Sequence, residues 1–351
     1  MTRRRRTLIA TAALAMLAGA AAARPLTVGF YLPWDAASRA SAVSHAGALD
    51  VLAPMSGALD SAAGTLRWQD DPARAPALAA AHGRAKVMPV ISNAHDNVWD
   101  TAAADGALLN PQAGEAFIAA LVAQARAQAY GGYILDFETL SPQAAPAYAP
   151  FLARLRDALR PQGRELWVTV SLAADPAVVH QLAQAADVVV LMAYDQCWAN
   201  STPGPIAGQD WLEANLEARL AQIDPAHVVV ALGAYGYDWP DGAPAAVVSA
   251  AAAAQLGKAA GQPDIRAAPD GNPHFSYAGP DGRDHTVWRL DAGAFRAQRA
   301  AVLARHTRGV AIWRLGLEDP ALWAARAPPA PALGPAPATP TPRCVALPPR
   351  P

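Results

Sequence analysis

The segment Gly132-Tyr133-Ile134-Leu135-Asp136-Phe137-Glu138 decides the fold class of this 351-residue chain. Its apolar part has the length and character of a β-strand that is buried on both faces. Side chains alternate along a strand, so Asp136 and Glu138 share one face while Phe137 points the other way. Barrels of parallel strands carry their functional groups at the carboxyl ends of the strands, which is where this pair of carboxylates falls.

Seven further short apolar runs, rich in β-branched residues, alternate with alanine-rich segments of helical periodicity such as 114–130 and 145–160. Strand and helix alternating eight times predict a closed (β/α)8 barrel, the TIM-barrel class of α/β fold. We expect this barrel to occupy residues 24–326. The eight predicted strands lie at residues 26–31, 49–53, 86–91, 132–137, 166–170, 187–192, 227–232 and 309–313.

Two segments depart from this alternation. Residues 265–290 place turn signals between β-type runs, which indicates a hairpin or small antiparallel insertion at about 262–290, between the seventh and eighth strands. Residues 327–351 are mostly Pro and Ala, and such a sequence cannot offset its ordering entropy by burial. We therefore predict a disordered tail there.

The first 23 residues have the layout of a secretory signal peptide. Arginines at 3–6 precede an apolar stretch at 8–18 that is too short to span a bilayer, and alanines at 21–23 suit a cleavage site. An uncleaved membrane anchor is the alternative. We expect a secreted or periplasmic protein, with no membrane span after cleavage, that is a monomer.

Charge and motifs exclude several classes of function. Lys and Arg total 28 against 29 Asp and Glu, and loss of the signal arginines leaves a net charge of about −5, so we expect no nucleic-acid partner. The chain has no phosphate-binding loop, no dinucleotide fingerprint and no serine elbow, and its 8 histidines show no metal-ligand spacing. We expect no cofactor and no metal. Cys197 and Cys344 are so distant in sequence that we expect no disulfide framework and a core held by apolar burial.

The two carboxylates have a spacing that suits acid–base chemistry. Asp136 and Glu138 stand roughly 6–7 Å apart by the rise of a strand. Like charges this close raise the pKa of at least one group, and a general acid needs a raised pKa near neutral pH. A solvated pair at the start of a loop is the alternative, but Ile134, Leu135 and Phe137 mark a buried strand, where an unpaired charge is costly.

Polar and aromatic residues also end the sixth predicted strand. Met192 and Tyr194 alternate onto one face, so the Tyr194 hydroxyl can enter the same cavity, and Asp195 can add an acceptor at its rim. The alternative is a core Met and Tyr with Asp195 as a turn cap.

Aromatic side chains follow further strands. Trp313, at the end of the eighth strand, can form an apolar floor for a sugar ring, although simple core packing is the alternative. Single surface aromatics mean little, but aromatics at four strand ends around two carboxylates predict a groove for a glycan. Those after the first and seventh strands are Tyr31, Trp34, Tyr235, Tyr237 and Trp239.

Residues 132–138 resemble the fourth-strand signature of glycoside hydrolase family 18, the chitinase-like barrels. That motif runs Asp-Gly-x-x-x-Asp-x-Glu, often with a further Asp in the middle. Residues 190–195 resemble the family's Met-x-Tyr-Asp, and residues 309–319 its Trp-bearing eighth strand. The resemblance covers about residues 26–325, and many members carry a small α+β domain where the insertion is expected. Two segments, residues 91–96 and 312–320, are most similar to one branch of the family. That branch includes spore-cortex-lytic enzymes and chitinase-like domains fused to polysaccharide deacetylases.

The resemblance implies a secreted glycosidase acting on β-linked polysaccharide that contains N-acetylglucosamine. In this family the substrate's own N-acetyl oxygen is the nucleophile, an exception among retaining glycosidases. Glu138 would then be the general acid and base, Asp136 would orient the acetamido group, and Tyr194 would hydrogen-bond its oxygen. The residues expected to line the substrate are Asp195, Trp313, Tyr31, Trp34, Tyr235 and Met192.

The sequence departs from the family motif at two positions. The first Asp is Gly131 here and the middle Asp is Ile134, which removes a partner that could share a proton with Asp136. We expect slower hydrolysis or a different pH optimum, not loss of activity. Two non-catalytic alternatives stay open: a glycan-binding protein on the same barrel, against which Glu138 argues, and an accessory module in envelope polysaccharide synthesis.

Overall fold

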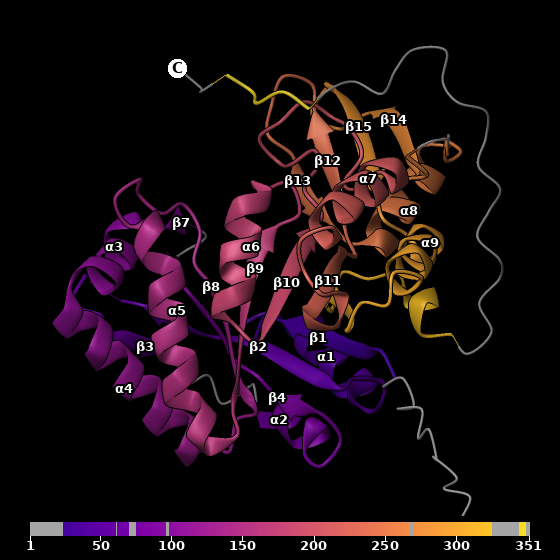
Figure 1. Ribbon diagram of the computed structural model, residues 1–351. Helices are drawn as coiled ribbons and strands as arrows, with labels where there is room; N and C mark the ends of the chain where they lie inside the picture. Colours follow the sequence, from indigo (N-terminus) through magenta and orange to yellow (C-terminus); the bar gives the residue numbers. More distant parts are fainter. Residues whose placement is uncertain are drawn as a thin grey trace, which may run out of the picture.

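The computed structural model describes residues 24–60, 62–69, 75–95, 98–266, 270–324 and 344–348. Within these residues eight parallel strands form a barrel, and β1 closes it by pairing with both β2 and β16 (Figure 1). Each of the eight predicted strands is confirmed. In barrel order they are β1 (Leu26–Tyr31), β2 (Val51–Leu59), β5 (Val90–Ser92), β8 (Gly132–Asp136), β9 (Glu165–Ser171), β10 (Val188–Ala193), β11 (Val228–Gly233) and β16 (Gly309–Trp313).

The third predicted strand is divided into β4 (Lys86–Val87) and β5. Pro89 lies between the two pieces and has no N–H to donate to a neighbouring strand, so the ladder is interrupted there. Its carbonyl oxygen still accepts the N–H of Ile134 at 3.0 Å, which keeps β5 beside β8. Two short hairpin elements extend this edge of the barrel: β3 (Leu66–Trp68), which pairs with the end of β2, and β6 (Ala94–His95) with β7 (Val98–Trp99).

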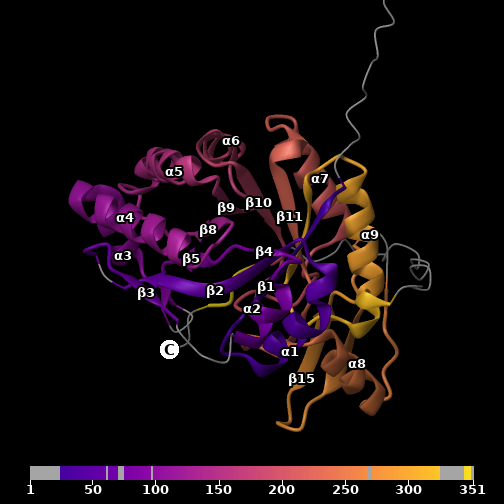
Figure 2. The same ribbon diagram turned by 90° about the horizontal axis from the view of Figure 1, so that it is seen from below.

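Helices surround the strands, as Figures 1 and 2 show. Their alanine-rich sequences favour helix, and several begin at an Asp or Asn whose side chain accepts a backbone N–H of the first turn, as Asp35, Asp100, Asn110 and Asp291 do. The helices outside the barrel are α1 (Ala36–His45), α2 (Ala75–Ala81), α3 (Thr101–Leu109), α4 (Pro111–Ala127), α5 (Ala145–Leu159), α6 (Pro176–Ala185), α7 (Gln209–Leu220) and α9 (Ala292–Leu303).

Alternation along each strand divides the core into two layers. On β8, Ile134 packs inside the barrel with Phe30, Met88 and Trp167, whereas Leu135 packs outward against the helices. Phe137 follows Leu135 into the outer layer, so Asp136 keeps the inward direction of Ile134. The predicted arrangement of this strand is confirmed in that respect.

An α+β insertion lies between β11 and β16, to one side of the barrel (Figure 2). The expected extent, about residues 262–290, was too short, because the sheet begins directly after β11. Tyr237 and Trp239, which were expected at loop positions, belong to its second strand in sheet order. The insertion consists of β12 (Gly236–Pro240), β13 (Ala246–Val248), α8 (Ala250–Ala259), β14 (His274–Ala278) and β15 (Asp284–Arg289), with strand order β13-β12-β15-β14.

A disulfide joins Cys197 to Cys344, across a sequence separation of 147 residues and a Cα–Cα distance of 5.1 Å. The expectation of no disulfide was wrong, because a closed barrel brings together segments that are far apart in sequence. The N–H of Thr202 donates to the Val345 carbonyl at 2.8 Å, and that of Leu347 to the Asn200 carbonyl at 2.7 Å. The predicted disordered tail is therefore wrong for 344–348; its other residues and the predicted signal peptide lie outside the described residues.

None of the helices in the described part of the chain is both long and apolar enough to cross a membrane.

Candidate active site

Asp136 ends β8 inside the barrel and is 6% exposed. At the other end of the strand, Gly132 has φ +149°, and a Cβ there would lie 1.8 Å from the Glu165 carbonyl oxygen. Only glycine permits this approach of β8 to β9. The glycine of the motif is therefore required by strand packing, which places the carboxylates that follow.

Hydroxyl groups lie beside Asp136 on both neighbouring strands. Ser92 on β5 is its partner in register and is buried. Thr169 on β9 donates its Oγ1–H to Asp136 Oδ1 at 2.5 Å. Burial raises the pKa of Asp136 to about 6, and the hydrogen bond from Thr169 opposes that rise.

Glu138 lies just beyond the strand, and a buried asparagine holds its backbone. Asn93 Oδ1 accepts the Glu138 N–H and Asn93 Nδ2 donates to the Glu138 carbonyl, each at 2.9 Å. Thr139 follows with φ +55°, an uncommon conformation for a β-branched residue. Burial raises the pKa of the Glu138 carboxyl to about 8, and the negative charges of Asp136 and Asp195 add to the rise.

Tyr194 and Asp195 follow β10 and face the same carboxylates. Asp195 has φ +55°, and its Oδ1 accepts hydrogen bonds from the hydroxyls of Tyr235 and, at 3.0 Å, Tyr237. Burial raises the pKa of Asp195 while these two hydrogen bonds oppose the rise. Burial raises the pKa of Tyr194 well above 10, and the negative charges of Asp136, Asp195 and Glu138 add to the rise. The Tyr194 hydroxyl therefore keeps its proton.

Trp313 completes the cluster from the end of β16. Its ring is stacked on Tyr194 with centroids 5.9 Å apart and an interplanar angle of 11°. Phe30 of β1 meets the same indole edge-on at 5.6 Å. The Trp313–Arg314 peptide bond is cis. Trp313 is partly exposed, so part of its ring can contact a ligand.

The structure brings most of the predicted site residues together, but not all. Met192 lies two residues after Val190 on β10, so its side chain points into the barrel as that of Val190 does, and it is half-buried. Tyr235 is buried and packs against Tyr194. Trp34, in the turn after β1, is 49% exposed. The prediction that Tyr31 lines the substrate is not supported, because Tyr31 is fully buried in the outer core layer.

Three residues that bond the predicted site residues were not predicted from the sequence. Asn93 and Thr169 act through hydrogen bonds to the two carboxylate residues, and Tyr237 binds Asp195 although it was noted only as an aromatic. A search for polar side chains on the inward face of every strand, not only at strand ends, finds Thr169. The hydrogen bonds between Asn93 and the Glu138 backbone depend on the conformation of the loop after β5, which hydrophobic periodicity does not predict.

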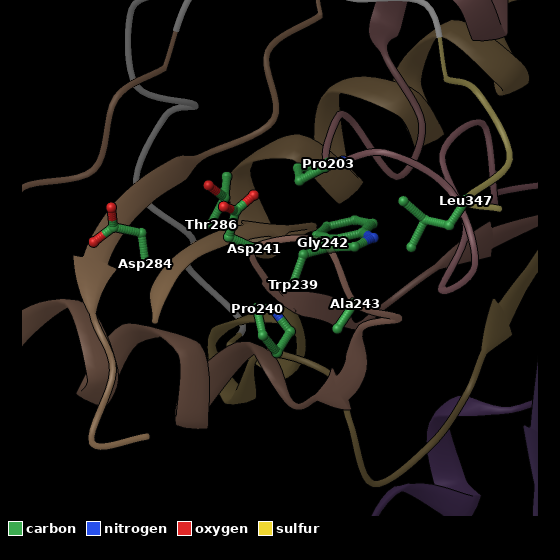
Figure 3. Close-up of a pocket in the computed structure, with 9 residues that line it drawn as sticks. All are labelled: Pro203, Trp239, Pro240, Asp241, Gly242, Ala243, Asp284, Thr286 and Leu347. Atoms are coloured by element: carbon green, nitrogen blue, oxygen red, sulfur yellow. The ribbon is translucent and has the colours of Figure 1, made fainter. Parts of the chain in front are cut away.

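A pocket of about 310 Å³ lies away from these residues, where the insertion meets the loop after β10 and the segment 344–348 (Figure 3). It contains none of the carboxylates described above, and Trp239 within it is 1% exposed. Among the described residues no group of three or more His, Cys, Asp or Glu side chains is arranged to hold a metal ion. The pocket is lined by Pro203, Trp239, Pro240, Asp241, Gly242, Ala243, Asp284, Thr286 and Leu347.

Residues 27–318 match the glycosyl hydrolases family 18. The chain belongs to this family. It is accordingly a glycosidase of the chitinase-like type, and the predicted fold and family are both confirmed. The family acts on chitin-like glycans.

Known proteins similar to this chain include glycosylases of Bacillus subtilis (strain 168). The uncharacterized glycosylase YvbX is 26% identical over 253 residues, 68% of this chain and 74% of that protein. A cortical fragment-lytic enzyme is 29% identical over 222 residues, 58% of this chain and 50% of the enzyme. The chain thus spans about half the length of the latter.

Solved structures show the same fold. A chitinase from Chromobacterium violaceum ATCC 12472 superposes with a TM-score of 0.79 at 26% identity, covering 86% of this chain and 98% of the chitinase. The spore cortex-lytic enzyme SleL of Bacillus cereus gives 0.76 at 23% identity, covering 85% of this chain and 73% of SleL.

Proposed function

We propose that this glycosidase hydrolyses β-linked polysaccharide containing N-acetylglucosamine, with the acetamido group of the substrate as the nucleophile. The observation that carries the proposal is the unequal pair at the end of β8. The pKa of Glu138 is raised to about 8 and that of Asp136 to about 6, so near pH 7 the first carries a proton and the second a negative charge.

These charge states suit a two-step reaction. Glu138 donates its proton to the glycosidic oxygen as the bond to the anomeric carbon breaks, and the acetamido oxygen attacks that carbon from the opposite face. The oxazolinium ion that forms is positive and is stabilised by ionised Asp136. Glu138, now a carboxylate, then takes a proton from the water that opens the ring, which restores the enzyme with net retention.

Two aromatic residues supply the remaining contacts. The Tyr194 hydroxyl, protonated at every pH of interest, can donate to the acetamido oxygen and limit its rotation. Trp313, stacked on Tyr194, offers its exposed ring surface to the apolar face of the sugar. Asp195, held by two tyrosine hydroxyls, adds a fixed acceptor beside Tyr194.

We further propose that the protein acts on an envelope or extracellular polymer. Support comes from the signal-like residues 1–23 and from the similar proteins, which include cortical fragment-lytic enzymes and a chitinase. The three candidate polymers are chitin, partly deacetylated poly-N-acetylglucosamine and peptidoglycan.

Release of reducing ends from these three polymers tests the proposal, with mass spectrometry to identify the products. The wild type should cleave at least one of them at β-linked N-acetylglucosamine, and Glu138→Gln should lower the rate by about 10²–10⁴-fold, as expected for loss of a general acid. Undiminished hydrolysis by Glu138→Gln, or binding of all three polymers without turnover by the wild type, contradicts it.

A further inference from the structure

The acidic neighbour that the family motif often provides for Asp136 is absent from β8. Position 134 is Ile134, which is fully buried among the apolar side chains inside the barrel. The carboxylate therefore has no acidic partner two residues before it on its own strand. A buried carboxylate without a hydrogen-bond donor is costly, so its donor has to come from elsewhere.

Thr169 on the adjacent strand β9 supplies that donor. Its hydroxyl lies 2.5 Å from Asp136 Oδ1 and 3.3 Å from the Leu135 carbonyl oxygen, and the residue is 7% exposed. Threonine is β-branched, and its χ1 is restricted on a strand, so the direction of the hydroxyl is fixed by the backbone of β9.

We propose that Thr169 is a positioning residue that holds the Asp136 carboxylate in its catalytic orientation, in place of the acidic residue missing at position 134. The inference rests on the proposed function, in which Asp136 faces the acetamido group. A residue of β9 would then contribute to the reaction, in addition to the motif on β8 and the residues that follow β10.

The influences on the Asp136 pKa that come from the described residues include no cation. The titratable side chains that interact with it are Glu138 on the same segment, Tyr194 after β10 and Tyr148 on α5. Burial raises the pKa of Asp136, and the Thr169 hydrogen bond is the opposing influence. Removal of this hydroxyl therefore has a measurable signature in the titration of Asp136.

A direct test follows the Asp136 carboxyl by NMR in protein labelled with ¹³C-aspartate. Glu138→Gln is used as background to remove the coupled group, and Asp136→Asn assigns the signal. Thr169→Val keeps the shape and removes the hydroxyl, and should raise the Asp136 pKa by about one unit or more. Thr169→Ser keeps the hydroxyl and should leave the pKa within about 0.3 of the background value.

A control separates positioning from general loss of a buried hydroxyl. Thr307 is also buried, and its hydroxyl donates to the Val302 carbonyl at 3.3 Å, so Thr307→Val should lower stability without moving the Asp136 titration. Equal Asp136 pKa values in Thr169→Val and Thr169→Ser overturn the inference.

The same variants with Glu138 intact connect the titration to the reaction. On N-acetylglucosamine oligomers the acidic limb of the kcat/KM profile of Thr169→Val should move to higher pH by the amount seen in NMR, and Thr169→Ser should restore it. An unmoved limb in Thr169→Val contradicts the role. If the wild type hydrolyses no substrate, the proposed function fails, while the NMR titration still decides whether Thr169 controls Asp136.

Discussion

Asp136 and Glu138 end the same segment, yet their surroundings give them different protonation states. Asp136 is buried within the barrel but has a hydroxyl donor, Thr169, on the neighbouring strand. Glu138 lies beside two other acidic groups, and its pKa is raised by burial and by both of their charges. The pKa of Glu138 is therefore higher than that of Asp136 because the two residues occupy different positions, one at the end of β8 and one just beyond it.

A bell-shaped dependence of kcat/KM on pH should follow from this ordering. Activity should fall as the pH drops through about 6, where Asp136 is protonated, and as the pH rises through about 8, where Glu138 loses its proton. Initial rates on a soluble N-acetylglucosamine oligomer between pH 4 and pH 10 measure both limbs. Full activity at pH 10 contradicts the assignment of Glu138 as the acid.

Glu138 should also lower the stability of the protein at neutral pH. Its pKa is raised from 4.5 to about 8 on folding, so its stabilising contribution is fully present below pH 4.5 and is lost as the pH rises through 8. Glutamine mimics the neutral acid at every pH. Glu138→Gln should therefore raise the free energy of unfolding by about 1–3 kcal/mol at pH 8.

Urea denaturation at two pH values measures this effect. The difference between Glu138→Gln and the wild type should shrink toward zero at about pH 3.5, one unit below the unfolded pKa of 4.5, where Glu138 is neutral in the folded chain and largely neutral in the unfolded chain. A difference that is the same at both pH values contradicts the linkage.

Strand alternation predicted the positions of the carboxylates, whereas it misplaced one of the aromatic side chains. Asp136, Glu138 and Tyr194 were found because strand alternation and strand ends determine where they point. Tyr31 was misplaced because that alternation turns it outward and leaves Phe30 against Trp313 instead. Thr169 was missed because its partner, Asp136, lies on another strand, and the register between two strands cannot be predicted from the sequence of either strand alone.

Between elements, Asn93 connects the loop after β5 to the end of β8. It is fully buried, and its side chain bonds the Glu138 N–H, the Glu138 carbonyl and, at 3.1 Å, the Asp100 carbonyl. One side chain thus satisfies three backbone groups from two loops. It holds the backbone of Glu138 against the loop after β5.

Asn93→Ala should destabilise the protein by about 2–3 kcal/mol, because buried backbone groups lose their partners. It should also lower kcat by roughly tenfold or more, since the Glu138 backbone is no longer held. Thermal unfolding and steady-state kinetics measure the two effects. Asn215→Ala is a control: among the described residues the Asn215 side chain donates to the Trp211 carbonyl within α7, so its loss should change kcat little. Equal kinetics in the two variants contradict the role of Asn93.

The element pattern shows why the barrel was easier to predict than the insertion. Most barrel strands contain a short apolar run and pair with the barrel strands that come before and after them in sequence, so the local pattern predicts them. β12 pairs with β15, which lies far ahead in sequence. Because the sequence does not show this partner, Tyr237 and Trp239 of β12 were interpreted as aromatic residues of a loop. The start of the insertion was therefore placed too late.

Across the whole molecule, the Cys197–Cys344 disulfide links the end of the described chain to the loop after β10. This loop leads from Asp195 to α7, and Cys197 packs in the same cluster as Tyr235 and Tyr237. The bond thus constrains both the tail segment 344–348 and a neighbour of the site. No sequence spacing suggested it, because the two cysteines are 147 residues apart and meet only in the folded structure.

Cys344→Ser should lower the free energy of unfolding by about 2–5 kcal/mol, because a cross-link over a long loop restricts the unfolded chain. Urea denaturation of the variant and of the wild type, each with and without reductant, measures the loss. Reductant should destabilise the wild type to about the level of the variant and leave the variant unchanged. A wild type that is indifferent to reductant contradicts the prediction.

In the proposed reaction Glu138 works with a nucleophile that belongs to the substrate. The most direct test compares kcat/KM for a chromogenic N-acetylglucosamine oligomer with that for the same compound carrying a trifluoroacetyl group on the sugar at the scissile bond. Fluorine withdraws electrons from the amide oxygen, so kcat/KM should be lower for the trifluoroacetyl compound by roughly a hundredfold or more. Equal kcat/KM values for the two compounds would contradict it.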